Sequence, residues 1–198
     1  LMPDTLDDNL NLTILTKFIL EKVKDFEKDI GSFIEKINVI TDAKYDQFSL
    51  SLKNKYNSNQ ISEIDVVRLI SDAKQFIMRN NKNCFILHVL VDKYIIDGNE
   101  YFEFPENLNY NELIIDVSFI TVSNSIIKIF NRILKDCNIE VKKFISHQHS
   151  SRFADDNDSS PCIAAKKVND GINPLEVKIH NSKAQKQGLF EKMFNFFN

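Results

Sequence analysis

The sequence predicts an α+β fold, in which helices cover a small antiparallel or mixed sheet of the strand-helix-strand-strand type, followed by an extended tail and a C-terminal amphipathic helix. Two observations support this prediction. Apolar residues recur at helical spacing in some segments and with a period of two in others, and these segments alternate along residues 10–145. The 198 residues are 43% hydrophobic and 27% charged, which is typical of a globular chain and argues against a largely disordered one.

The first half of the chain begins with a predicted helix over residues 10–28, where apolar side chains share one face and Gly31 follows as a C-cap. Two short strands are expected at 34–40 and 47–53, the second because apolar and polar residues alternate in it. Ser62 and Asp65 form an approximate capping box. Apolar residues at helical spacing then extend a second helix to about residue 79.

The second half predicts two strands, a helix and a last strand. Residues 85–97 are rich in β-branched and aromatic side chains and end at Asp97-Gly98, a strong turn signal. Residues 112–122 alternate apolar and polar side chains, as a strand with one buried face does. A serine at 123 or 125 can cap a third helix that ends near Cys137, and residues 139–145 return as a strand.

The composition changes after residue 146. Residues 147–187 are rich in Ser, Asp, Asn, Lys and Gln and have no clear periodicity, which predicts a flexible linker or a remnant of a larger domain. Residues 188–198 form an amphipathic helix on a helical wheel, with lysines nearby, which favours insertion into a membrane interface over docking on the domain itself. The predicted membrane-binding residues are Leu189, Phe190, Met193, Phe194, Phe196 and Phe197.

Residues 88–98 read HVLVDKYIIDG. This segment resembles FtsA, the actin-like bacterial cell-division protein, at the start of the core of its inserted subdomain 1C. Val91 stands where the family pattern has proline. Segments 61–66, 119–123 and 137–141 also resemble family segments in the same order and spacing, so the resemblance covers roughly residues 32–146. The family-motif residues are His88, Val89, Leu90, Tyr94, Asp97 and Gly98.

The resemblance implies a truncated FtsA-like protein. Residues 1–31 would then be a helix of the neighbouring subdomain, 32–146 subdomain 1C, 147–187 the linker or remnant, and 188–198 the membrane-targeting helix. Subdomain 1C implies self-association and contacts with division proteins through exposed sheet edges and loops. The family's ATP site and its docking surface for the tubulin-like protein FtsZ belong to subdomains that are not matched here, so neither ATP binding nor FtsZ docking is carried over.

Two short motifs each have a structural interpretation and a chemical one. Residues 29–32, Asp-Ile-Gly-Ser, match the D-x-G-[ST] phosphate loop of actin-like ATPases, but they follow a predicted helix and have no second glycine-rich loop, so a helix cap is favoured. His147 and His149 could ligate a metal, but no third ligand is evident in the sequence. An exposed linker is therefore the favoured interpretation of this segment.

The other candidate catalytic residues have structural interpretations. Cys84 and Cys137 lie within apolar patterns and are expected to be buried thiols, while His88 is expected to be a hydrogen-bonded strand histidine. Residues 166–198 carry six lysines against three acidic residues, although the whole chain has a formal charge of -3. The body is therefore acidic, which argues against nucleic acid as its partner. No apolar run is long enough to cross a membrane.

We therefore expect a non-enzymatic protein of the bacterial divisome or septum, held peripherally on the cytoplasmic face of the inner membrane. Its expected partners are division proteins or further FtsA-like copies, and an anionic membrane surface. No cofactor, metal or catalytic residue is expected, and ATP with magnesium should leave the thermal stability unchanged. The alternative is a soluble binding or structural module, or an inactive product of a decayed gene.

Overall fold

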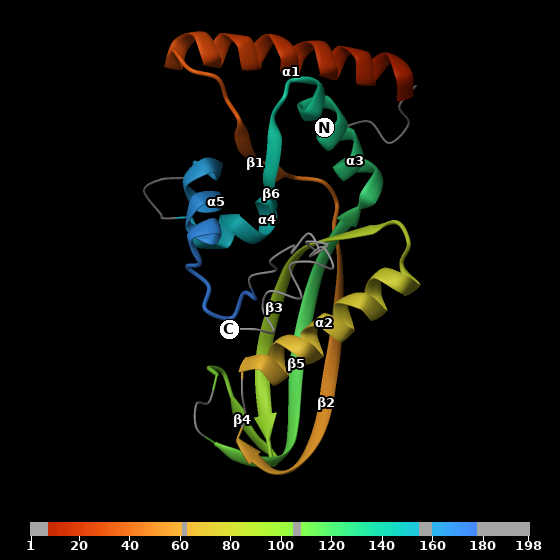
Figure 1. Cartoon of the computed structure of the whole chain (residues 1–198), viewed down its shortest axis with the longest axis vertical. Coiled ribbons are helices and arrows are strands. Elements are labelled where there is room, and N and C mark those ends of the chain that lie inside the picture. Colours follow the sequence, from red (N-terminus) through yellow and green to blue (C-terminus); the bar gives the residue numbers. More distant parts are fainter. Residues whose placement is uncertain (1–7, 61–62, 105–107, 155–159, 178–198) are drawn as a thin grey trace, which may run out of the picture.

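The computed structural model describes residues 8–60, 63–104, 108–154 and 160–177. Its first elements are α1 (Asp8–Ile30), β1 (Lys36–Thr41), β2 (Asp46–Gln60) and α2 (Glu63–Asn80). They are followed by β3 (Cys84–Ile96), β4 (Asn99–Tyr101), β5 (Asn109–Ser123), α3 (Asn124–Asp136), β6 (Glu140–Ser146), α4 (His147–Ser150), the 3-10 turn η1 (Ser151–Phe153) and α5 (Pro161–Asp170). Figure 1 shows the larger sheet at one end and α1 across the other.

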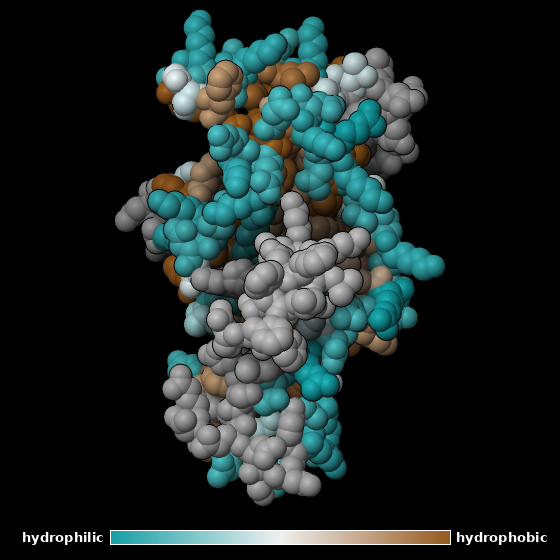
Figure 2. Space-filling view, in the orientation of Figure 1, coloured by the Kyte–Doolittle hydropathy of each residue, from teal (hydrophilic) through white to brown (hydrophobic). Residues whose placement is uncertain are grey.

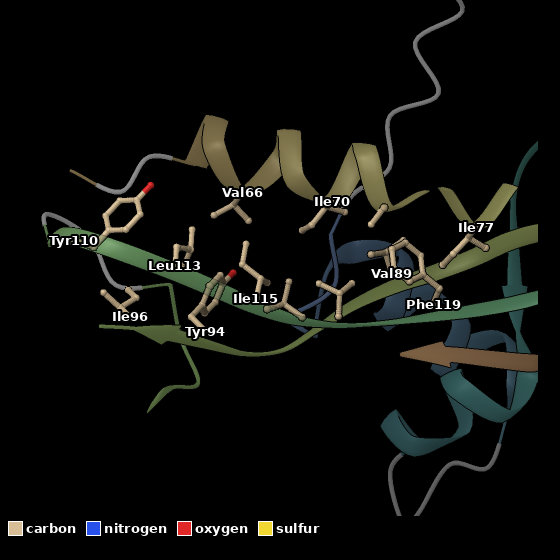
Figure 3. Packing of buried hydrophobic residues seen from close by; sticks show 13 residues of the cluster. Val66, Ile70, Ile77, Val89, Tyr94, Ile96, Tyr110, Leu113, Ile115 and Phe119 are labelled. Carbon is tan, nitrogen blue, oxygen red and sulfur yellow. The ribbon is translucent and has the colours of Figure 1, made fainter. Parts of the chain in front are cut away.

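The larger sheet is antiparallel, with strand order β2-β5-β3-β4, and α2 lies along one of its faces (Figure 1). The period-two alternation in its strands places apolar side chains on that face, where they meet Val66, Ile70 and Ile77 of α2 (Figure 3). Burying each large apolar side chain stabilises the fold by roughly 1.5–3 kcal/mol. The strand residues of this core are Val89, Val91, Tyr94, Ile96, Tyr110, Leu113, Ile115, Val117 and Phe119.

The smaller sheet is a parallel pair of β1 and β6, which runs from Lys36 opposite Glu140 to Thr41 opposite Ser146. A second apolar cluster connects this pair to the larger sheet, because Leu87 of β3, Ile127 of α3 and Phe144 of β6 are buried together. The α+β class predicted from the sequence is confirmed, but the strands form two sheets where one was expected.

After β6 the chain forms α4, η1 and α5, so the flexible-linker alternative is wrong for residues 147–154 and 160–170. The other alternative, a remnant of a larger domain, stays a prediction. The Ser146 hydroxyl caps α4 by accepting a hydrogen bond from the backbone N–H of His149. In α5, Pro161 occupies the first turn and Gly171 caps the far end at a φ of 88°. The helix packs through small side chains: Ala165 and Val168 lie against Ile145. Residues 155–159 and 178–187 of the predicted linker lie outside the described residues.

Helix α1 carries apolar side chains on its outer face. Four of them are more than half exposed: Ile14, Phe18, Phe26 and Ile30. In Figure 2, hydrophobic residues gather at the end of the molecule that α1 crosses. Gly31 follows the helix with a φ of 69°, which confirms the cap interpretation of residues 29–32. Among the described helices, none is both long and apolar enough to span a membrane.

Candidate functional site

The family-motif residues lie on β3 and on the turn that follows it. Val89 and Tyr94 are buried beneath α2, and Leu90 is half-buried. Asp97 and Gly98 have φ values of 48° and 87° between the paired residues Ile96 and Asn99. Two consecutive positive φ values are what a two-residue type I′ hairpin requires, and glycine adopts them with least strain.

The Asp97 side chain fixes this hairpin against the start of β5. Its carboxylate accepts hydrogen bonds from the backbone N–H of Asn111 at 3.0 Å and of Glu112 at 2.8 Å. The Asp-Gly pair and the apolar motif residues therefore build the fold. Of the six motif residues, His88 makes the contacts that point to a site.

A register shift positions His88. The pairing of β3 with β5 skips Leu87, so that Ile86 and Val89 both contribute to the core under α2. Leu87 instead packs in the cluster around Phe144, and His88 turns toward α4. Such a bulge redirects side chains that a regular strand would place on the other face. As a result, the imidazole of His88 is buried on the face of the sheet opposite α2.

The site is a cluster of His88, His149, Glu176 and Lys143, which we call the His-Glu cluster. His88 Nδ1 lies 2.8 Å from Glu176 Oε1, and His149 Nε2 lies 3.3 Å from Oε2. Lys143 Nζ lies 3.4 Å from Oε1. The side chains of His88, His149 and Glu176 are 0%, 2% and 8% exposed. Three segments far apart in the sequence thus converge on one buried carboxylate.

Hydrogen bonding defines the proton positions in His88. Its Nε2 accepts a 3.0 Å hydrogen bond from the backbone N–H of Ser146, so in the neutral ring the proton is on Nδ1 and is donated to Glu176. Burial lowers the pKa of His88, which favours this neutral form. Burial alone raises the pKa of Glu176, but hydrogen bonds from His149 and His88 outweigh it and hold that pKa well below its ordinary value. The pair is a neutral imidazole donating to a carboxylate.

The His-Glu cluster also has the composition of a metal site, since three potential ligand atoms lie within 4.8 Å of one another. Two contacts do not fit that chemistry. His88 Nδ1 carries the proton donated to Glu176 and so has no lone pair for a metal ion. Lys143 places a positive charge beside the same carboxylate. These contacts indicate that the cluster holds the Glu176 carboxylate. His147, the other histidine that the sequence suggested as a ligand, does not belong to the cluster.

Glu176 is brought to His88 by a short strand-like segment. The backbone N–H of Val91 donates to the carbonyl of Leu175, and that of Val177 donates to the carbonyl of Val89, each at 2.9 Å. Glu176 and Leu90 form an antiparallel β-bridge. We call residues 175–177 the clasp, because this segment pairs with β3 and carries the carboxylate.

A groove of about 460 Å³ lies beside the clasp. Its walls come from α2, β3, α3, β6, α5 and the clasp, and they include the apolar side chains of Met78, Phe85, Val141 and Phe144. Lys74 and Lys142 also line it.

The free edge of β2 is a second surface of interest. Val89 and Val91 direct their backbone groups to the clasp, so their partners on β5, Phe119 and Val117, direct theirs to β2. Phe119 and Val117 face Phe48 and Leu50 of β2. By alternation, the backbone N–H groups of residues 49, 51 and 53 point away from the sheet. In the described part of the chain β2 pairs with β5 alone, which leaves that edge open.

Sequence reasoning predicted a hydrogen-bonded His88, which is confirmed, and missed its partners. His149 was assigned to an exposed linker and is instead buried; a serine cap before it at Ser146 was the available signal. Cys84 and Cys137 are half-buried, and burial raises the pKa of both thiols. The predicted membrane-binding residues Leu189, Phe190, Met193, Phe194, Phe196 and Phe197 lie outside the described residues.

Comparison with known proteins adds one match. The family model of the SHS2 domain inserted in FtsA matches residues 46–121, which run from the start of β2 almost to the end of β5. The matched span contains the six motif residues and α2. No curated protein matches the chain.

Proposed function

We propose that this chain, whose residues 46–121 match the SHS2 domain inserted in FtsA, acts in bacterial cell division as a protein-interaction module tethered to the cytoplasmic face of the membrane. The family match supports the role in cell division. The interaction surface and the tether are the finer parts of the proposal, and each has its own support and its own test.

The open edge of β2 supports an interaction role. An edge strand with unpaired N–H groups is a template for pairing with a strand of another chain. Around the centre of β2 the outward-facing positions carry Ser49, Ser51 and Lys53, which leave the backbone accessible. We propose that division proteins, or a second copy of this chain, add a strand here.

Ser51→Pro tests this surface, because proline removes the outward N–H and leaves the hydrogen bonds to β5 in place. Ser51→Ala is the matched control, since both changes remove the hydroxyl that donates to Asp116. We expect sedimentation velocity to show concentration-dependent self-association for the unchanged chain and for Ser51→Ala, and loss of it for Ser51→Pro. Equal self-association of both variants would exclude this edge as the surface.

The proposed tether is the amphipathic segment 188–198, supported by the separation of its apolar and polar residues on a helical wheel. Co-sedimentation with anionic lipid vesicles should be lost when the chain ends at Gln187. A helix this short is marginal in water, so one copy should bind weakly and several copies in an assembly more firmly. Equal pelleting of both chains, or none, would favour the soluble alternative.

We propose that the chain acts by binding and not by catalysis. The phosphate-loop-like residues 29–32 are the last two residues of α1 and the two that follow it, with Gly31 at a positive φ, which supports this view. ATP with magnesium should therefore leave the melting temperature unchanged. A clear upward shift, which a bound ligand produces by mass action, would contradict the proposal.

A further inference from the structure

The larger and the smaller sheet are joined by apolar and by polar contacts. The apolar contacts come from the cluster that contains Leu87 of β3, Ile127 of α3 and Phe144 of β6, and none of these three side chains can titrate. A polar contact joins His88 of β3 to Ser146, which is the last residue of β6 and the N-cap of α4. Both residues are buried, at 1% and 3% exposure. The junction between the sheets therefore includes an imidazole that is shielded from water.

The hydrogen bond between His88 and Ser146 exists only while the imidazole ring is neutral. Its acceptor is the lone pair of His88 Nε2, which lies 3.0 Å from the backbone nitrogen of Ser146. In the imidazolium ion both ring nitrogens carry a proton, so a rotated ring would still point an N–H group at the N–H of Ser146. Protonation therefore replaces a buried hydrogen bond with a contact between two donors, which is unfavourable.

The other side of the ring accommodates the proton. His88 Nδ1 donates to the carboxylate of Glu176 in both protonation states of the ring. The clasp also keeps its two backbone hydrogen bonds to Val89 and Val91, which involve no titratable group. A positive charge on the ring therefore disturbs the contact with Ser146 and leaves the clasp in place.

Among the described residues, three charged or titratable groups face His88: Glu176 of the clasp, His149 of α4 and Lys143 of β6. Burial has the largest influence and lowers the pKa of His88; Glu176 favours the protonated ring, and His149 and Lys143 oppose it. When the junction opens, the ring meets water and its pKa returns to about 6.5. The open form then binds a proton that the closed form does not, so acid shifts the equilibrium toward the open form.

We propose that His88 is an acid-sensitive switch between the two sheets, whose protonation separates β3 from the end of β6 at Ser146 while the clasp stays on β3. The apolar cluster around Phe144 keeps the sheets together and acts as the hinge. A fall in pH thus loosens the arrangement of the two sheets without unfolding either of them. The inference concerns a change within the chain and goes beyond the proposed function.

Hydrogen exchange of the folded chain, followed by NMR at about pH 7.5 and about pH 5.5, tests the switch. Protection factors correct each amide for the intrinsic effect of pH on exchange. At both pH values the amide of Ser146 should be less protected than that of Val117, which lies inside the larger sheet. The protection of Ser146 should fall by up to about tenfold at the lower pH, the effect of one proton on a group with a pKa of about 6.5. The amide of Val177 should then exchange more slowly than that of Ser146, because the clasp stays paired.

Two variants separate the two buried histidines. In His88→Asn the protection of Ser146 should no longer depend on pH in this range, because the titrating ring is gone. His149→Asn is the matched control, since it removes the other histidine that contacts Glu176, and here Ser146 should lose protection in acid as it does in the unchanged chain. Circular dichroism checks that both variants remain folded. A pH dependence that survives in His88→Asn, or one that vanishes in His149→Asn, would overturn the assignment to His88.

A measurement on the unchanged chain makes the test independent of the variants. Nitrogen-15 NMR detects the scalar coupling between the amide nitrogen of Ser146 and His88 Nε2 through their hydrogen bond, and it also shows which ring nitrogen carries a proton. We expect this coupling, and a proton on Nδ1, at about pH 7.5. The proposal would be overturned by a proton on Nε2 at that pH, or by protection of Ser146 that equals that of Val117 or does not change with pH. Equal exchange of Ser146 and Val177 at the lower pH would also overturn it, because the clasp would then open as well.

Discussion

The Nδ1 atom of His88 lies 2.8 Å from Oε1 of Glu176, although the two residues are 88 positions apart in the sequence. This contact joins the SHS2-matched segment to the part of the chain that follows β6. Glu176 accepts from a second histidine through its other oxygen. One carboxylate therefore adds two side-chain contacts to the backbone hydrogen bonds that hold the clasp on β3.

Glu176→Gln should lower the free energy of unfolding by about 1–3 kcal/mol, the usual cost of leaving a buried polar group unsatisfied. The amide can accept from one histidine only, because its NH₂ group would face the N–H of the other. Urea unfolding followed by circular dichroism measures the change. Glu103→Gln is the control at an exposed glutamate and should alter stability by less than about 0.5 kcal/mol. Equal effects of the two changes would contradict the role of the cluster.

Acid should destabilise the protein in two stages. The pKa of His88 is lowered in the folded state, so the unfolded chain takes up its proton first, and stability falls as the pH drops below about 6.5. The pKa of Glu176 is also lowered, and its contribution is present above about pH 4.5 and is lost as the pH falls through its folded-state value. Lys143, His149 and Glu176 are the titratable groups that face His88.

The first stage is measured as the difference between the unfolding free energies at about pH 7.5 and about pH 5.5. In His88→Asn the difference between the two values should become smaller, because the buried imidazole is gone. His147→Asn is the matched control, since His147 is half-buried and lies outside the His-Glu cluster. A pH dependence that persists unchanged in His88→Asn would assign it to other groups.

Gly98→Ala should cost about 1–2 kcal/mol, the penalty for placing a side chain in the left-handed region. A Cβ atom at this position would meet no atom of the described residues within 4 Å, so the expected cost comes from the backbone. Gly98→Asn should cost less, because asparagine tolerates this conformation. Thermal unfolding shows which of the two variants is the less stable. A loss of stability as large for asparagine as for alanine would disprove the backbone explanation.

Ile70→Ala should destabilise the protein by roughly 2–5 kcal/mol, because Ile70 is 4% exposed between α2 and the sheet. Val67→Ala on the same helix is the control, since Val67 is 58% exposed and its truncation should change stability by less than about 0.5 kcal/mol. Chemical denaturation of both variants tests which face of α2 carries the packing. Similar losses would contradict the placement of this helix.

The strands and helices of the SHS2-matched region could be predicted because each buries one face and so shows its period in the sequence. Phe48, Leu50 and Leu52 alternate on β2, and all three pack against the core. Asp97-Gly98 predicted the two-residue turn between β3 and β4, although the three-residue strand β4 is too short to show a period.

The site could not be predicted for two physical reasons. The bulge at Leu87 breaks the alternation that would tell where His88 points. Glu176 lies in a three-residue pairing that has no periodic signal, and α5 packs through small residues such as Ala164 and Ala165, which weaken its amphipathic pattern. Contacts between distant segments depend on the fold, and local sequence carries no record of them.

The parallel pairing of β1 with β6 has a consequence for the order of folding. Lys36 and Glu140 are partners across roughly a hundred intervening residues, so their pairing closes a long loop at a cost in chain entropy. That cost falls once the larger sheet has brought the two ends of the loop together. Contacts of such sequence separation slow folding. We therefore expect the β1–β6 pair to form last, and its amides to gain protection in pulsed hydrogen exchange after those of β3 and β5. Translation would then have to pass residue 146 before the domain can close.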